Sequence, residues 1–232
     1  MSRKRIWICL CVFVSGLIMA RTSVAQNSVA VANLDLAQMR LHDVQIGEQS
    51  IAQFFSRLAL AYDIPIGLEV AQDDDEWSIY CLDFKEGTLA ELLNQFVKTH
   101  KAYTWEIKNG TVNIFPTRNY RDDVVAELLQ TEINSFSVRE KTSCAAFGSS
   151  LVATPEVKRI IRDKNLTYKA GNIEGFYIEQ LGQHFVLNVS KLKLKAILDT
   201  VIKESPTARI WIIKRDLGNN ILVMRIKARL EM

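Results

Sequence analysis

A hairpin signal constrains the fold of this chain more than any other feature of its sequence. Asn109-Gly110 separates two runs in which apolar residues alternate with polar ones. Asn-Gly readily takes the positive φ angles of a type I′ turn, which closes two-residue β-hairpins. Such a loop places Ile107 opposite Val112 and Trp105 opposite Ile114, so these four side chains share one face. We therefore predict an antiparallel hairpin whose apolar face is core.

A strand and a helix precede this hairpin. Thr88 and Glu91 have the spacing of a capping box, in which each side chain accepts a hydrogen bond from the other residue's backbone N–H. Apolar residues at helical spacing follow, and Leu92 and Leu93 are predicted core positions on this face. The whole face consists of Leu89, Leu92, Leu93, Phe96 and Val97. Upstream of Gly87, alternate apolar residues in 80–84 predict a strand with one buried face.

The segment before it has a similar pattern. Ser50 can cap a helix whose apolar residues again fall on one face. That face consists of Ile51, Phe54, Phe55, Leu58, Ala59 and Tyr62. Alternation at 44–46 predicts a strand before this helix. Pro65 and Gly67 are expected to end the helix, and 64–70 can form a strand after it. The acidic run Asp73–Glu76 predicts a loop.

Residues 43–115 therefore have the order strand, helix, strand, strand, helix, hairpin. The stretch YCLDFKEGTLAELLNQFVKTHKAYTWEIKNGTVNIFP resembles the secretin and TonB N-terminus short domain, with its alternating strand, threonine-leucine-led helix, short aromatic strand and hairpin return. The resemblance implies an α+β fold and a role in docking partners or passing signals at outer-membrane machinery. The long acidic loop and the absence of a following β-barrel or secretin domain depart from that family's usual context. This departure concerns the family's transport and secretion roles, not its fold.

The second half of the chain repeats the pattern. Apolar positions in 185–202 match those in 80–97 at a shift of 105, and those in 147–152 match 54–59 at a shift of 93. We therefore predict two strand-helix-strand-strand-helix-hairpin units in tandem. Ile197 and Leu198 then take the core positions of Leu92 and Leu93, and Trp211 lies one position from the shifted Trp105. The difference between the shifts leaves room for an extra helix starting at Thr154-Pro155.

The first 25 residues have the three parts of a secretory signal peptide: Arg3–Arg5, the apolar run Ile6–Ala20, and small residues at Ser23 and Ala25. Fifteen helical residues reach roughly 22 Å, short of a hydrocarbon core of about 30 Å. Cleavage near Ala25 is therefore favoured over an uncleaved anchor, and we expect a periplasmic or secreted protein with no membrane span after cleavage. The predicted organisation is a signal peptide (1–25), a leader (26–40), a first domain (41–116), a linker that can be helical (117–134) and a second domain (135–232).

Charge divides with the halves. After residue 25 the chain has 25 basic and 26 acidic side chains, so its charge gives no reason to expect a nucleic-acid partner. Residues 26–133 carry a net charge of −9 and residues 134–232 a net charge of +8. Either these are two solvated surfaces, or the halves attract each other, or the basic half binds an acidic partner.

Cysteine and histidine usage points to no catalytic chemistry. Cys81 and Cys144 could form a disulfide between the halves of an exported protein, although a lone buried thiol is equally ordinary. The histidines His42, His100 and His184 are isolated, without the spacing of metal ligands.

Sequence motifs of enzymes are equally poor. Ser190-x-x-Lys193 matches a serine–lysine signature without its companion motifs, and we interpret Ser190 as a strand-to-helix cap. No nucleophile elbow or phosphate loop is present. We therefore expect no catalytic, metal or cofactor site.

The function expected from these features is that of a non-enzymatic binding or adaptor module of the bacterial envelope. It would dock to an outer-membrane receptor, a secretion component or a signalling component. An open sheet edge is the expected docking element, either in the hairpin 104–115 or in the strand near Val44. The alternatives are a periplasmic enzyme with an unrecognised site and a structural envelope component. The partner, the pathway and the oligomeric state stay open.

Overall fold

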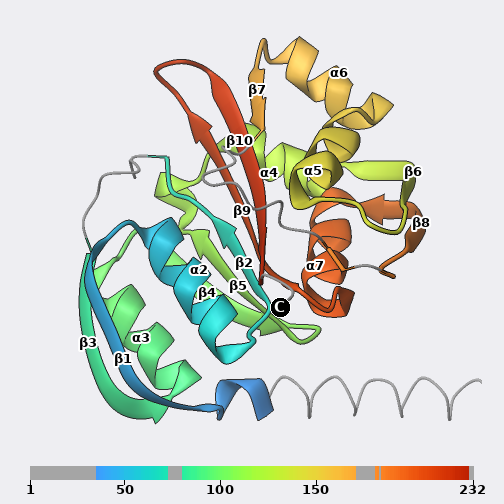
Figure 1. The fold of residues 1–232 in the computed structure, drawn as a ribbon. Coiled ribbons are helices and arrows are strands. Elements are labelled where there is room, and N and C mark those ends of the chain that lie inside the picture. Colours follow the sequence, from blue (N-terminus) through green and yellow to red (C-terminus); the bar gives the residue numbers. More distant parts are fainter. Residues whose placement is uncertain (1–34, 73–79, 171–180, 183, 230–232) are drawn as a thin grey trace, which may run out of the picture.

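The computed structural model describes residues 35–72, 80–170, 181–182 and 184–229, and it has the predicted α+β class (Figure 1). The predicted signal peptide, most of the predicted leader and the acidic run 73–76 lie outside these residues. In the part of the chain that the structure describes, no helix is both long and apolar enough to cross a membrane.

Local capping signals begin the two main helices of the first half. Ser50 and Gln53 form a capping box at one helix, and Thr88 and Glu91 form another. The first helix ends at Asp63, whose left-handed conformation (φ 60°) terminates it. Pro65 and Gly67, the expected end signals, follow the helix, and Gly67 lies inside the strand predicted within 64–70. The elements of this half are β1 (Arg40–Gln49), α2 (Ile51–Tyr62), β2 (Ile66–Glu69), β3 (Tyr80–Thr88), α3 (Leu89–Thr99), β4 (Tyr103–Lys108) and β5 (Thr111–Pro116).

The hairpin has the predicted register. β4 and β5 are antiparallel, with Trp105 opposite Ile114 and Ile107 opposite Val112. Asn109 (φ 53°) and Gly110 (φ 75°) form the turn, and both have the positive φ that a type I′ turn requires.

The second half contains the predicted extra helix. The Ser143 hydroxyl caps α5 by accepting from the N–H of Ala146, and Thr154-Pro155 begins α6 with proline at its first turn. One prediction is wrong here: Ser190 caps no helix but lies in a strand, because α7 begins only after Lys193. The elements are the 3-10 turn η1 (Arg118–Tyr120), α4 (Asp123–Gln130), β6 (Glu132–Val138), α5 (Cys144–Val152), α6 (Pro155–Asp163), β7 (Thr167–Ala170), β8 (Leu187–Lys193), α7 (Leu194–Glu204), β9 (Ala208–Asp216) and β10 (Ile221–Ala228).

A six-stranded sheet joins the two halves, in the order β4-β5-β2-β9-β10-β7. In each half a hairpin pairs in parallel with an earlier strand, β5 with β2 and β10 with β7. The halves meet where β2 pairs in parallel with β9. The strand order is therefore the same in both halves, but the strand directions are reversed, so the second half is turned over relative to the first.

This inversion places helices on both faces of the shared sheet. Figure 1 shows five layers: the β1–β3 pair, then α2 and α3, then the central sheet, then α7 with α4 and α5, and finally the β6–β8 pair. β9 belongs to both hydrophobic cores. Ile210 and Ile212 pack with the first half, whereas Trp211 and Ile213 pack with the second.

The two halves share further details. Ser50 and Ser143, separated by 93 residues, cap equivalent helices, and α3 and α7 begin 105 residues apart. β1–β3 and β6–β8 are separate antiparallel pairs on the outside of their halves. These parallels support the predicted duplication, which we keep as an inference.

Candidate functional site

The described residues offer little for catalysis. No group of histidine, cysteine and acidic side chains among them could hold a metal ion. His42 is exposed in β1 and His184 in a turn before β8, and the His100 ring packs at a tilt against Phe96 at the end of α3. Ser190 is exposed in β8, and the Lys193 ammonium donates to the side chain of Gln130 at 2.7 Å. The features that could serve a function are therefore surfaces and junctions.

The residues selected as core from the sequence differ in how deeply they are buried. Most have relative exposures between 0 and 2%, whereas Trp105 and Ile107 are only half-buried. The fully buried group consists of Leu92, Leu93, Val112, Ile114, Ile197, Leu198 and Trp211. The two exceptions are explained by position, because both belong to β4, the outermost strand of the sheet.

The outer edge of β4 carries backbone groups that β5 does not use. In an antiparallel pair, alternate residues direct their N–H and C=O groups toward the partner strand. The carbonyl of Ala102 accepts from Thr117, so the even-numbered residues of β4 face β5. Trp105 and Ile107 therefore point their N–H and C=O groups outward, and no described strand pairs with this edge.

Half-buried side chains lie next to these outward backbone groups. Trp105 and Ile107 pack against the first core from its rim, and the indole N–H of Trp105 donates to Asn94 of α3 at 3.2 Å. A strand added here would extend both the sheet and its apolar face. The other edge expected from the sequence, near Val44, is β1, which pairs only with β3 among the described strands.

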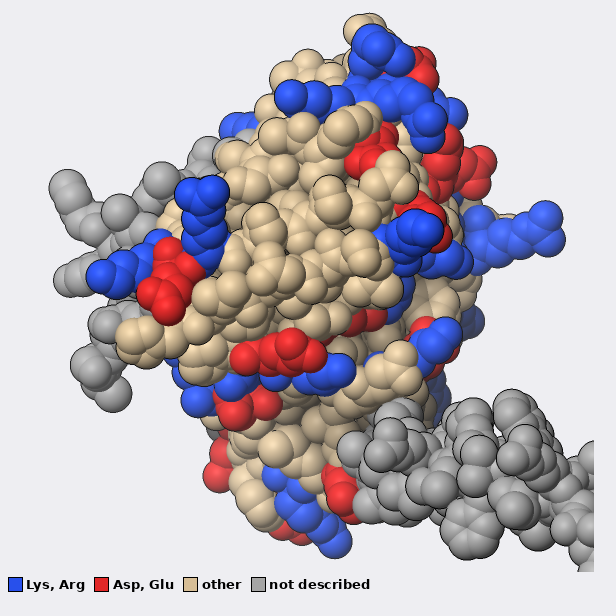
Figure 2. All heavy atoms as spheres, turned by 90° about the vertical axis from the view of Figure 1, so that its right-hand side faces the viewer, with Lys and Arg blue, Asp and Glu red and all other residues tan. Residues whose placement is uncertain are grey.

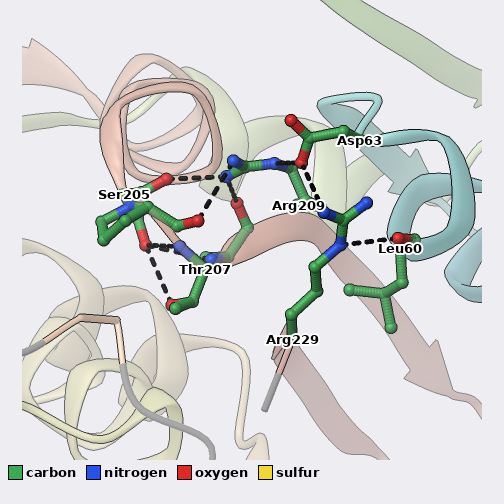
Figure 3. A network of polar contacts seen from close by, with 8 residues as sticks. Leu60, Asp63, Ser205, Thr207, Arg209 and Arg229 are labelled. Carbon is green, nitrogen blue, oxygen red and sulfur yellow. Dashed lines mark hydrogen bonds and ion pairs between the residues drawn. The ribbon is translucent and has the colours of Figure 1, made fainter. Parts of the chain in front are cut away.

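The halves contact each other through a polar network at one end of their junction (Figure 3). Asp63, at the end of α2, accepts from the Arg209 Nε of β9 and pairs with Arg229 at 3.4 Å. Arg229 Nε also donates to the carbonyl of Leu60 at 2.7 Å. Two cations therefore lie at the negative end of the α2 dipole. The Arg209 guanidinium continues the network to the carbonyl of Ser205.

The centre of the junction is a close contact between a backbone and an indole ring. A Cβ on Gly67 would lie 2.5 Å from Cε2 and 2.9 Å from Nε1 of Trp211, so only glycine fits here. The ring is also held by a hydrogen bond, because its Nε1 donates to Asp199 at 2.8 Å. Lys195 binds Asp199 at 2.6 Å and reaches across to Asn113 of β5 at 2.5 Å.

Ion pairs between the halves join an acid of the first half to bases of the second. Among the described residues, Asp63 pairs with both Arg209 and Arg229 in this way. Two other pairs, Asp122–Arg215 and Glu127–Lys164, lie within the second half, because α4 packs in the second core. Of the interpretations of the charge division, attraction between the halves thus has direct contacts behind it. A further pair fixes the linker to the buried Glu69 of β2: Arg121 donates twice to this carboxylate, at 2.8 Å each, and this raises the pKa of Arg121.

The structure leaves the predicted disulfide untested. Cys144 is buried at the start of α5, whereas the side chain of Cys81 in β3 is outside what the structure describes. Figure 1 draws β3 and α5 far apart, on opposite sides of the central sheet. The bond therefore stays a prediction.

Comparison with known proteins adds no relative. No protein family, curated protein or solved structure matches the chain. The resemblance to the secretin and TonB short domain therefore rests on the sequence pattern alone.

Proposed function

We propose that this protein is a non-enzymatic docking module of the bacterial envelope, exported by its N-terminal signal and binding a protein partner along the open edge of β4. The observation that carries the proposal is the edge itself: outward backbone groups at Trp105 and Ile107 beside their half-buried side chains. Backbone bonds give such strand addition its affinity, and alternate side-chain contacts give it specificity.

The edge also favours one kind of partner segment. An extended segment alongside β4 would place alternate side chains next to Trp105 and Ile107, where apolar groups fit. Its other side chains would lie beside Glu106 and Lys108, which are exposed on the opposite face. The fitting segment is therefore a strand with one apolar and one polar face, carried by an envelope protein.

The test separates the contribution of the backbone N–H of Ile107 from that of its side chain. Ile107→Pro removes an outward N–H without touching the β4–β5 ladder, and edge strands tolerate proline. Ile107→Val keeps the N–H and serves as the matched control. Affinity capture from envelope extracts, followed by identification of the captured protein, should recover one partner with the wild-type and valine chains and lose it with the proline chain. Equal recovery by all three, or a hydrolytic activity that depends on one polar side chain, would overturn the proposal.

Export has its own measurement. N-terminal sequencing of the chain recovered from the envelope should begin at Gln26. An intact Met1 on cytoplasmic material would contradict export while leaving the β4 edge to be tested separately.

A further inference from the structure

Among the described elements, helix α6 has no counterpart in the first half. α5 corresponds to α2, but α6 follows α5 as an addition before β7. Its apolar side, Val157 and Ile160, is buried in the second core. Its outer side exposes Lys158, Arg159 and Arg162. An added element that turns a row of cations to solvent distinguishes this end of the molecule.

The acidic groups near α6 are mostly engaged with other partners. Arg162 pairs with Asp163 at 2.9 Å, and Lys164, just after the helix, pairs with Glu127 at 3.0 Å. Glu156 accepts from Asn134 at 2.6 Å. No acidic group among the described residues pairs with Lys158 or Arg159. Figure 2 shows the resulting cluster of Lys and Arg at the top of the molecule, over α6.

The tip of the β9–β10 hairpin adjoins this basic helix. Asn220 in the turn donates to the carbonyls of Lys164 (3.2 Å) and Asn165 (2.5 Å), and its own carbonyl accepts from Thr167. Leu217 at the tip is 43% exposed. Asp216 is the acid of this tip, and hydrogen bonds from Asn219 hold its pKa below the ordinary value. The end therefore combines cations with a single projecting apolar side chain.

We propose that this end of the molecule, formed by α6 and the β9–β10 tip, binds anionic phospholipid surfaces. A protein partner would need an apolar centre to its interface, and Leu217 is the one large apolar side chain exposed on the described part of this end. Charge is then the main attraction, and each Lys or Arg near an anionic surface contributes to it. The acidic first half carries the opposite charge, so the field of a membrane would turn the basic half toward it. The site is independent of the β4 edge.

Vesicle binding tests this proposal. The purified chain is mixed with vesicles of phosphatidylcholine alone or with 30% phosphatidylglycerol (roughly the range in which surface charge matters), and sedimentation gives the affinity. We expect tighter binding to the anionic vesicles than to the neutral ones, and salt should reduce this difference. The triple variant Lys158→Gln, Arg159→Gln, Arg162→Gln should bind roughly 100-fold more weakly, at about fivefold for each charge.

A second triple variant controls for net charge. Lys85→Gln, Lys98→Gln and Lys101→Gln remove three exposed cations from the first half and should leave the affinity within about twofold. All variants share one N-terminus, so the apolar run 6–20 contributes equally to each. Leu217→Ser should weaken vesicle binding but not binding to polyglutamate. The proposal would be overturned if the chain did not bind anionic vesicles, or if both triple variants lost affinity equally. It would also be overturned, in favour of an acidic protein partner, if Leu217→Ser left vesicle binding unchanged and the chain bound polyglutamate as tightly as vesicles.

Discussion

Gly67→Ala offers the sharpest test of the junction between the halves. The new Cβ would lie 2.5 Å from Cε2 of Trp211, whereas carbon atoms pack at about 3.5–4.0 Å. The ring is 2% exposed and hydrogen-bonded to Asp199, so it cannot simply turn aside. Either the indole moves and weakens that bond, or β2 and β9 separate.

The expected loss follows from these contacts. Overpacking a filled core costs about 1–3 kcal/mol, and a weakened hydrogen bond adds about 0.5–1.5 kcal/mol. Alanine restricts the unfolded chain and offsets about 0.4–1 kcal/mol of this. We expect Gly67→Ala to lower the free energy of unfolding by about 0.5–4 kcal/mol, measured by urea denaturation. The melting temperature should fall by roughly 2–4 °C for each kcal/mol in a chain of this size.

Two comparisons make the result interpretable. Gly218→Ala is the control, because its Cβ would meet only an Asp216 oxygen at 3.5 Å, and its effect should stay within about 0.5 kcal/mol. In a chain that already carries Trp211→Leu, Gly67→Ala should cost at least about 1 kcal/mol less than in the wild type, since contacting residues couple. A neutral Gly67→Ala, or equal costs in both backgrounds, would refute the contact as the cause.

Two further predictions concern the cores and the caps. Leu92→Ala and Ile197→Ala should each destabilise the chain by about 2–5 kcal/mol in the same denaturation assay, because both side chains are fully buried; exposed-site values below about 0.5 kcal/mol would contradict the placement. Hydrogen bonds from Thr88, its backbone N–H first, hold the pKa of Glu91 below its ordinary value of 4.5, so the stability from this pair is present above that value and is lost as pH falls through the lowered one. Glu91→Gln should remove this part of the acid sensitivity, and an unchanged stability–pH curve below pH 4.5 would speak against it.

Local structure could be predicted from the sequence because its causes are local. Ser50 and Thr88 precede apolar residues at helical spacing, and Asn109-Gly110 specifies a turn. The interpretation of Ser190 failed because a serine before a helix is a cap only if it is the residue next to the first turn, and Lys193 occupies that place.

The joining of the halves was missed, although two signals pointed to it. Residues 210–213 form an unbroken apolar run, which is typical of a strand buried on both faces. A glycine inside a strand, here Gly67, often marks a close approach of another group. Neither signal says which strand will be the neighbour, because β2 and β9 are far apart in sequence. For the same reason the half-exposed state of Trp105 could not be foreseen: it depends on β4 having no outer neighbour.

The operation that relates the two halves is open: applied repeatedly, it does not return to the starting unit. Repeating the step from β2 to β9 would bring another β9-like strand against β7, and the series would continue indefinitely rather than close. The residues of the outer strand β4 do not support a further unit in this series. Where β9 meets its neighbour with Ile210 and Ile212, the corresponding face of β4 carries Thr104 and Glu106. The polar side chains of β4 therefore replace the apolar contacts that a further unit would need at this edge.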